Sequence, residues 1–326
     1  MTGDGIASGV AASGPSGHLG GTAGAGAAPP PARALTGAAR AAELRAEVAA
    51  LAASLTERGT TPRLAVLVAT EDESTAWYVR SIARAATKTG IVCDTVTLPP
   101  TASPDRIAEL LAELSADPAV HGVILQTPLP PGAVAAELAA AIAPDKDVDG
   151  ANPLSLGRLA AGRPAFAPAT AAAVVELLDA HGIELLGRTV AVVGRSTVVG
   201  KPLAHLLLDR DATVTVCHSR TADLAAATRH ADIVVAAAGR PGLITAAHIG
   251  EGAVVVDVGT NPTPEGGLTG DVDAESVAPK AGALSPVPGG VGPITTALLL
   301  RHTVRAAERA AGAATGPEPG AGPGLT

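Results

Sequence analysis

The sequence predicts an α/β protein of two domains, and three observations support that fold class. Short apolar, β-branched runs alternate with helical segments from about residue 40 to residue 258. A glycine turn at residues 194–200 joins a strand to an apolar helix, which is typical of a doubly wound parallel sheet. The last long helix, at about residues 293–311, has no strand after it. We therefore expect this helix to pack back on the first domain.

The first domain should consist of βα units, because strand-like and helix-like runs follow one another closely. An amphipathic helix is expected first, and a leucine-rich and valine-rich strand follows it. Gly90 ends the second expected helix. The helices are expected at residues 40–55, 73–89, 104–114 and 134–142, and the strands at residues 64–68, 92–98 and 122–126.

The second domain should open with a helix at residues 169–181, which Gly182 closes. Four apolar strands with helices between them indicate a Rossmann-like domain, and they are expected at residues 190–193, 213–216, 233–236 and 254–258. The first domain then comprises residues 34–149 plus 290–311, and the second comprises 150–289. Residues 1–33 and 312–326 are rich in Gly, Ala and Pro, so we expect disordered tails.

Composition excludes several classes of function. A net charge of −8 over 326 residues argues against a nucleic-acid partner, and 1% aromatic residues leave few stacking surfaces. No apolar run approaches the ~20 residues that span a bilayer, and no secretory signal is visible. The two cysteines, Cys93 and Cys217, lie far apart, which indicates reduced thiols and no metal site. We therefore expect a cytoplasmic protein.

The glycine turn predicts a phosphate site, because glycine admits close approach of a pyrophosphate to the start of a helix. Gly194, Arg195 and Ser196 open this turn. The next strand ends in Cys217-His-Ser-Arg220, without the acid that would bond the ribose of NAD. Ser219 and nearby arginines suit a 2′-phosphate, so the pattern favours NADP. The alternative is that the arginines are merely solvated.

Four further segments combine polar residues with glycine or proline at predicted element ends. Each also has an ordinary structural explanation: core aromatics, an exposed turn, a helix cap or a rigid loop. Ligands bind at the carboxyl ends of strands, so Gln126 and Asp149 are expected near the cleft between the domains. The segments are Trp77-Tyr-Val-Arg-Ser-Ile82, Gln126-Thr-Pro-Leu-Pro130, Lys146-Asp-Val-Asp-Gly150 and Pro286-Val-Pro-Gly-Gly-Val-Gly-Pro-Ile-Thr295.

With these segments the chain resembles the bifunctional methylenetetrahydrofolate dehydrogenase/methenyltetrahydrofolate cyclohydrolase family, the FolD-type enzymes, over residues 35–311. The resemblance implies a homodimer that oxidises 5,10-methylenetetrahydrofolate with NADP and then hydrolyses the methenyl product to 10-formyltetrahydrofolate. The motifs that carry it are Tyr78-Val-Arg-Ser81, Gly122-Val-Ile-Leu-Gln-Thr-Pro-Leu-Pro130, Pro144-Asp-Lys-Asp-Val-Asp-Gly150, Gly194-Arg-Ser-Thr-Val-Val-Gly-Lys-Pro202, Asp257-Val-Gly-Thr-Asn261 and Pro286-Val-Pro-Gly-Gly-Val-Gly-Pro293.

The resemblance also implies roles for individual residues. Tyr78 would line the folate site, Gln126 would polarise the catalytic centre, and Asp149 would bond the pterin ring. The cofactor would be held by Gly194, Arg195, Ser196, Ser219 and Thr260. The segment that would close over the substrate and nicotinamide consists of Pro288, Gly289, Gly290, Val291 and Gly292.

One departure from the family pattern concerns the hydrolytic step. The family has a lysine four residues after the tyrosine as general acid/base, and this chain has Ile82 there. An alkyl side chain transfers no proton, and Arg80 and Arg84 should face elsewhere on the helix. Smaller departures are Thr127, where leucine is usual, and Ala169-Thr-Ala171 in place of Cys-Thr-Pro.

We therefore expect an NADP-dependent dehydrogenase with weak or absent cyclohydrolase activity. Two alternatives stay open at this point. One is a non-catalytic paralogue that binds NADP or folate, and Ile82 favours it. The other is an NADP oxidoreductase for a different small substrate, against which Gln126 and Asp149 argue.

Overall fold

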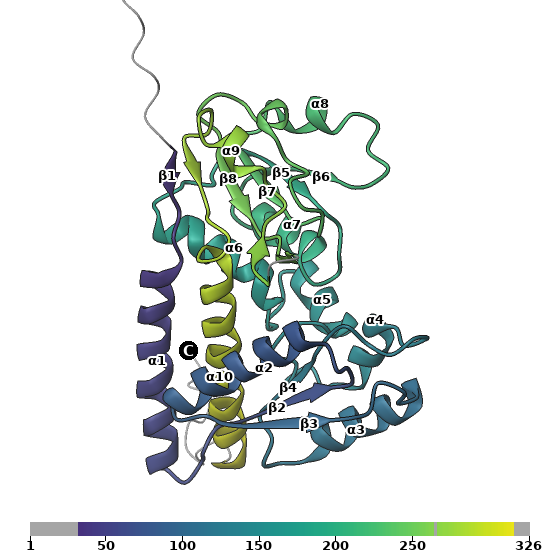
Figure 1. The fold of residues 1–326 in the computed structure, drawn as a ribbon. Helices are drawn as coiled ribbons and strands as arrows, with labels where there is room; N and C mark the ends of the chain where they lie inside the picture. The colour runs from purple at the N-terminus through teal and green to yellow at the C-terminus, as the bar shows by residue number, and fades with distance from the viewer. Residues whose placement is uncertain (1–31, 264–265, 316–326) are drawn as a thin grey trace, which may run out of the picture. The chain divides into compact units, whose positions relative to one another are not determined.

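A computed structural model describes residues 32–263 and 266–315, and it has the α/β architecture that the sequence predicts (Figure 1). The described chain forms a three-stranded parallel sheet, a six-stranded parallel sheet and a small antiparallel hairpin. The strands of the three-stranded sheet lie in the expected first domain, and the strands of the six-stranded sheet lie in the expected second domain except for a two-residue strand at residues 33–34. Within these residues, no helix has both the length and the apolar character that crossing a membrane requires.

The three-stranded sheet has the order β3-β2-β4, with β2 (Arg63–Val68) between β3 (Val92–Thr97) and β4 (Gly122–Leu125). Two helices connect these strands, α2 (Glu73–Lys88) and α3 (Pro104–Ala116). Both helices begin at a capping side chain, because the side chains of Asp72 and Ser103 accept backbone N–H groups of the first turn. The expected strand–helix alternation of the first domain is therefore confirmed.

Strand β2 is buried on both faces, and its alternate residues belong to two different apolar cores. Leu64 and Val66 share a core with α1 (Ala38–Glu57) and α10 (Val291–Thr315). Ala65 and Leu67 share another with α3. Because side chains alternate across a strand, this continuous apolar run is what a parallel strand between two helical layers requires.

The six-stranded sheet has the order β1-β11-β8-β7-β5-β6. The chain runs from β5 to its neighbour on one side, the edge strand β6, and then crosses to its neighbour on the other side, β7. Such a switch point is where doubly wound folds bind ligands. The strands are β1 (Arg33–Ala34), β5 (Thr189–Val193), β6 (Thr213–Cys217), β7 (Ile233–Ala236), β8 (Val254–Asp257) and β11 (Ala283–Leu284).

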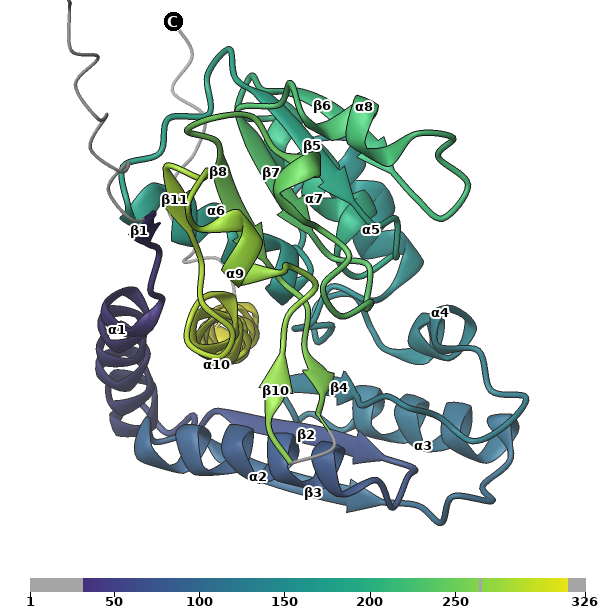
Figure 2. The same cartoon turned by 45° about the horizontal axis from the view of Figure 1, so that its top comes forward.

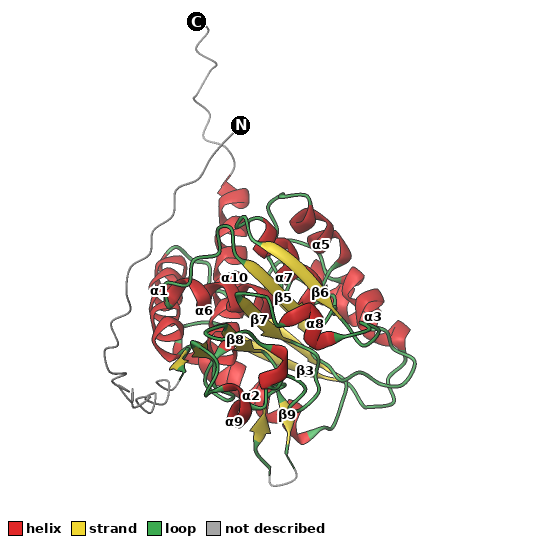
Figure 3. Ribbon diagram, turned by 90° about the horizontal axis from the view of Figure 1, so that it is seen from above, coloured by secondary structure: helices red, strands yellow, loops and turns green. Residues whose placement is uncertain are grey.

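Helices cover both faces of this sheet. Val190 and Val192 of β5 pack in the core that contains α6 (Ala169–Ala180) and α7 (Gly200–Leu208). Ala191 and Val193 face the other core, which includes residues of α8 (Leu224–Thr228) and α9 (Ala274–Val277). Figure 3 shows α6 and α7 on one side of the strands and α8 and α9 on the other. The doubly wound prediction is confirmed.

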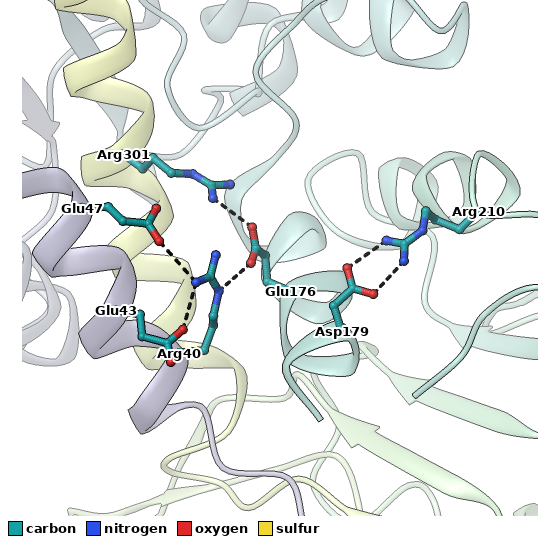
Figure 4. Close-up of polar contacts among 7 residues, drawn as sticks. All are labelled: Arg40, Glu43, Glu47, Glu176, Asp179, Arg210 and Arg301. Atoms are coloured by element: carbon teal, nitrogen blue, oxygen red, sulfur yellow. Dashed lines mark hydrogen bonds and ion pairs between the residues drawn. The ribbon is translucent and has the colours of Figure 1, made fainter. Parts of the chain in front are cut away.

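Helix α10 packs beside α1 and α6, and it also contacts α2, β2 and β4 of the first domain (Figures 1 and 2). The expectation that the last helix returns to the first domain is therefore confirmed. A charged cluster reinforces the three-helix packing, because the carboxylate of Glu176 on α6 binds Arg40 of α1 at 2.9 Å and Arg301 of α10 at 2.9 Å (Figure 4).

The structure corrects the expected boundaries of the N-terminal and C-terminal tails. Arg33, assigned to the N-terminal tail, lies in β1, where its backbone N–H bonds the carbonyl of Gly282. Helix α10 begins at Val291 and continues through Gly312 to Thr315, beyond its expected end at residue 311. Alanine, the strongest helix former, follows Gly312 and offsets the cost of that glycine. The rest of the expected tails, residues 1–31 and 316–326, lies outside the described residues.

Several short elements carry little sequence signal and were not expected. The predicted helix at residues 134–142 is divided into α4 (Ala135–Leu138) and the 3₁₀ turn η1 (Ala139–Ala141). The connection between β7 and β8 holds only a 3₁₀ turn, η2 (Ala246–His248), where a helix was expected. The other unexpected elements are α5 (Pro153–Ala160), β9 (Asn261–Pro262) and β10 (Leu268–Thr269), together with β1, α9 and β11.

Candidate active site

Four strands of the large sheet end in one row. Val193 of β5 is in register with Cys217 of β6 and with Ala236 of β7, and Ala236 is in register with Asp257 of β8. The predicted cofactor residues follow directly after this row, at the carboxyl edge of the sheet. They are Gly194, Arg195 and Ser196 after β5, Ser219 after β6, and Thr260 after β8.

The turn after β5 requires glycine at both of its ends. Gly194 has φ +133°, and a Cβ there would lie 2.0 Å from the carbonyl oxygen of Ala237. A Cβ on Gly200 would lie 2.0 Å from the carbonyl oxygen of Gly194. Ser196 shapes the turn from inside, because its hydroxyl accepts the N–H of Val199 and its carbonyl accepts that of Lys201. The strand, the turn and the start of α7 therefore form one compact unit.

This unit fits a bound pyrophosphate. Arg195 and Ser196 are exposed, and no side chain caps the start of α7. The dipole of α7 places partial positive charge at this helix start, which favours an anion. Ser219 and Arg220 are exposed beyond the neighbouring strand, and no carboxylate ends that strand. Thr260 is also exposed at this edge. The residues present therefore suit a phosphorylated dinucleotide.

Two buried carboxylates hold the loops of this edge, and the sequence analysis did not assign them a role. Asp271 accepts the backbone N–H groups of Ala238, Gly239 and Arg240 at 2.6 to 2.9 Å. It also accepts the side-chain amide of Asn261 at 2.9 Å. The loops after β7 and β8 are thus tied to one side chain. The Gly-Asp-Val-Asp run at 270–273 was the only available signal.

Asp257 makes the matching connection from the end of β8. Its carboxylate accepts the N–H groups of Gly259, Asp271 and Val272, each at 2.9 Å. Burial raises the pKa of Asp257, and the three N–H donors oppose that rise. Because these donors belong to the backbone, the pair of carboxylates fixes loop geometry and leaves little freedom for the segment that carries Thr260.

Tyr78 lies on α2, where it packs against the main apolar core. Its hydroxyl hydrogen-bonds the side chain of Thr296 on α10. Burial, and then the nearby charge of Asp149, raise the pKa of Tyr78, so the phenol stays protonated near neutral pH. Trp77, the adjacent residue, is 60% exposed and is not a core aromatic.

Asp149 follows the buried residue Val148 at the junction of the two domains. Its carboxylate accepts the N–H of Ala169 at the start of α6. Burial, together with the charge of Asp147, nevertheless raises the pKa of Asp149 to about 7. Asp147 is fully buried and accepts the N–H groups of Ala151 and Asn152, so this segment is not an exposed turn.

Gln126 follows β4, as the sequence predicts, and its backbone N–H bonds the carbonyl of Leu67. Its side-chain amide donates to the carbonyl of Thr127 at 2.9 Å, and the hydroxyl of Thr75 on α2 reaches the same oxygen at 3.5 Å. The structure therefore connects Gln126 to the first turn of α2. Among the described residues, no hydrogen bond joins Gln126 to Tyr78 or Asp149.

The proline–glycine segment joins β11 to α10. It is anchored to the start of α1, because the N–H of Gly37 bonds the carbonyl of Gly289 at 2.8 Å. Gly290 is buried and bonds the carbonyl of Pro286 at 2.9 Å. Pro288 and Gly292 are exposed, whereas Val291 is buried. Part of this segment therefore faces outward, immediately before the helix that carries Thr296.

Ile82 has an exposed fraction of 0% and belongs to the main apolar core. It shares the buried face of α2 with Thr75, Val79 and Ala86. Arg80 and Arg84 of the same helix are exposed. No basic side chain of α2 therefore occupies the position of Ile82, one turn from Tyr78.

Two family models match the chain. The tetrahydrofolate dehydrogenase/cyclohydrolase catalytic domain matches residues 35–149, and the corresponding NAD(P)-binding domain matches residues 168–311. Among curated relatives, "Bifunctional protein FolD 1" of Saccharopolyspora erythraea is 67% identical over 266 residues, 82% of this chain and 91% of that protein. The protein of the same name from Rhodococcus jostii is 64% identical over 275 residues, 84% of this chain and 93% of its own.

Solved structures agree with these matches. The bifunctional FolD enzyme of Campylobacter jejuni has a TM-score of 0.81 and 38% identity, with 84% of this chain and 98% of that chain covered. The Trypanosoma brucei enzyme, solved with NADP cofactor and an inhibitor, has a TM-score of 0.82 and 37% identity, with 86% and 99% covered.

Proposed function

The chain belongs to the tetrahydrofolate dehydrogenase/cyclohydrolase family, and we propose that it oxidises 5,10-methylenetetrahydrofolate to the 5,10-methenyl form with NADP. We further propose that hydrolysis to 10-formyltetrahydrofolate is weak or absent. One contrast carries this proposal. The turn expected to hold the cofactor leaves no room for a Cβ at Gly194 or Gly200, whereas Ile82 stands in an apolar core where the family has a lysine.

On the cofactor side, the proposed roles belong to residues at the sheet edge. The turn of Gly194, Arg195 and Ser196 would hold the pyrophosphate at the start of α7. Ser219 and Arg195 would bind a 2′-phosphate. Thr260 would contact the nicotinamide half from the loop that Asp257 and Asp271 hold rigid. NADP, when bound, supplies the hydride acceptor.

On the folate side, the proposed roles require fixed positions and no proton-transferring amine. Asp149 would bond the pterin nitrogens, and its raised pKa lets it act as donor or acceptor near neutral pH. Tyr78, held by Thr296, would form one wall of the site. Gln126 would polarise the reacting centre, and the segment formed by Pro288, Gly289, Gly290, Val291 and Gly292 would exclude water.

We expect the rate of hydrolysis to be lowered more than the rate of hydride transfer because the two steps need different groups from the protein. Hydride transfer needs two rings in register, which the surrounding backbone can supply. Hydrolysis needs a group that moves protons to and from water, and loss of such a group typically costs about 10²–10⁴-fold in rate. Ile82 offers no such group.

The domain roles follow the same division. We assign residues 34–149 and 290–311 to folate binding and residues 150–289 to NADP. The contacts of α10 with α1, α2, β2 and β4 support its place in the folate domain. Assembly as a homodimer and a cytoplasmic location stay predictions from the resemblance.

The proposed loss of hydrolysis is tested by supplying methenyltetrahydrofolate to the wild-type protein and to Ile82→Lys and Ile82→Met variants. We expect the wild type and Ile82→Met to hydrolyse it barely faster than buffer, and Ile82→Lys to gain rate. Hydrolysis by the wild type at a rate comparable to its NADP reduction would refute the proposal.

A non-catalytic paralogue is the second candidate, and the buried Ile82 favours it. It predicts binding of NADP or folate without turnover. Reduction of NADP in the presence of methylenetetrahydrofolate excludes this candidate, and calorimetric binding of both ligands without any reduction would establish it.

A further inference from the structure

A buried histidine on α10 holds the backbone next to Asp149. His302 is 8% exposed, and its Nδ1 lies 2.8 Å from the carbonyl oxygen of Val148. A carbonyl oxygen only accepts hydrogen bonds, so Nδ1 must carry the proton. This contact fixes both the tautomer and the direction of the ring.

The charges around His302 keep the imidazole neutral. Burial, followed by Arg301 and Arg309 of the same helix, lowers the pKa of His302 to about 4, and the Val148 carbonyl and Glu176 of α6 oppose this shift. The histidine therefore remains a neutral Nδ1–H donor throughout the physiological pH range.

An aromatic contact restricts the ring further. Phe166, the only phenylalanine of the chain, packs against His302 with 4.9 Å between ring centroids. The guanidinium of Arg309 lies 4.6 Å from the centroid of Phe166. Because Phe166 leads into α6, the ring of His302 packs between its own helix and the segment that enters α6.

The segment held by His302 is already tightly packed on its other side. Gly150 has φ +64°, and a Cβ there would lie 2.5 Å from the backbone nitrogen of Pro168. The Asp149 carboxylate accepts the N–H of Ala169, the residue that follows Pro168. The Val148 carbonyl and the Asp149 carboxylate are thus held from α10 and from the start of α6, respectively.

The same helix also holds the other folate-side residue. Thr296 hydrogen-bonds Tyr78, and His302 follows six residues later, about 9 Å along the helix axis. We propose that His302 is a positioning residue that, through the Val148 carbonyl, sets the place of the Asp149 carboxylate relative to Tyr78 and so orients the folate. This role deepens the proposed function and rests on it.

The test compares two substitutions that differ in the donor they offer. In His302→Asn the side-chain amide lies close to the place of Nδ1 and can still donate to Val148. In His302→Leu the volume is kept and the donor is lost. We expect His302→Leu to raise the KM for methylenetetrahydrofolate about tenfold, the worth of one buried hydrogen bond, with the KM for NADP unchanged. We expect His302→Asn to stay near the wild type.

A matched control separates positioning from general stability. Thr303→Val alters the next residue of α10, which is fully buried and whose hydroxyl donates to the carbonyl of Leu299. We expect this variant to lower the melting temperature without a change in KM. If His302→Leu behaved like Thr303→Val, or if His302→Asn were as impaired as His302→Leu, the positioning role would be overturned.

A replacement variant and a titration that needs no enzyme activity complete the test. If His302→Leu fails to fold, His302→Gln replaces it, because its amide reaches the place of Nε2 and cannot serve Val148. The titration of the Asp149 carboxyl, followed by carbon NMR and assigned with Asp149→Asn, needs no activity, and its midpoint should move in the donor-deficient variant alone. Asp147 and Tyr78 are the ionisable groups that face Asp149. An inactive wild type would refute the proposed function, whereas an unmoved midpoint would refute the positioning role.

Discussion

The cofactor edge and the folate side of this protein are built by different means. At the cofactor edge the backbone carries the geometry: strands end in register, glycines permit contacts at which a Cβ would not fit, and two carboxylates bind loop N–H groups. On the folate side, single side chains in low-dielectric surroundings carry the chemistry, and their pKa values are shifted by burial. One site is therefore sensitive to shape and the other to charge.

The largest effect is expected from adding a methyl group at the cofactor edge. Gly194→Ala would place a Cβ 2.0 Å from a backbone oxygen at φ +133°. The turn would have to move, so we expect NADP affinity to fall by about 100-fold, or ~2.7 kcal/mol. Gly157→Ala in α5 is the control, because nothing lies within 4 Å of its Cβ position. Equal NADP titrations for the two variants would contradict the shape requirement.

On the folate side, Asp149→Asn should act through charge without a change in shape. We expect a loss of about 10–100-fold in dehydrogenase kcat/KM, the worth of a hydrogen bond to a charged group, with NADP binding preserved in a fluorescence titration. A variant that lost both properties equally would show that the two sites are not built separately.

The same variant should alter the pH dependence of stability. The folded-state pKa of Asp149, about 7, lies above its ordinary value of 3.8. Its contribution is thus fully present below about pH 3.8 and lost as the pH rises through about 7. The unfolding free energy of the wild type should therefore fall relative to Asp149→Asn between pH 4 and pH 8. Urea titrations that show a constant difference would contradict the assignment.

A smaller effect is expected from removing the charge of Arg195, which we propose favours NADP over NAD. Arg195→Ala should weaken NADP by about tenfold, as loss of one exposed phosphate contact costs ~1–2 kcal/mol, and leave NAD unchanged. The KM values for the two cofactors measure this directly. An unmodified protein that prefers NAD would refute the choice of NADP.

The smallest effect concerns the helices that join the two regions. Glu176 binds two arginines from α1 and α10, whereas Asp179 pairs, among the described residues, with Arg210 alone, and that pair is more exposed (Figure 4). We expect Glu176→Gln to lower the unfolding free energy by about 1 kcal/mol and Asp179→Asn by less than ~0.5 kcal/mol. Thermal unfolding of both variants at low and high salt checks this order.

The two regions also differ in how far the sequence predicts them. The cofactor edge could be predicted because Gly194, Gly200 and four apolar strands have patterns that backbone geometry imposes. Gln126 and Asp149 were expected near the cleft from their places in the chain, but the roles of Tyr78, Gln126 and Asp149 came only from the family resemblance and stay predictions. No sequence pattern predicts the contact of Tyr78 with Thr296, since it joins residues that are far apart in sequence.

The features that the sequence did not predict depend on tertiary partners. Strand β1 is two residues long and exists because it pairs with β11 at the edge of the sheet. Nothing in the sequence distinguishes Asp271 from the other acidic residues, and only the fold brings three N–H groups to its carboxylate. His302 lies in an apolar helix, where only the approach of Val148 gives its ring a role.

We propose that the redox half of the site is intact and that the hydrolytic half lacks the lysine it needs. The most direct test is to incubate the protein with methylenetetrahydrofolate and NADP and to count methenyltetrahydrofolate accumulated per NADPH formed, corrected for spontaneous hydrolysis. We expect NADPH formation with a ratio near one. A ratio near zero with rapid NADPH formation, or no NADPH at all, would contradict it.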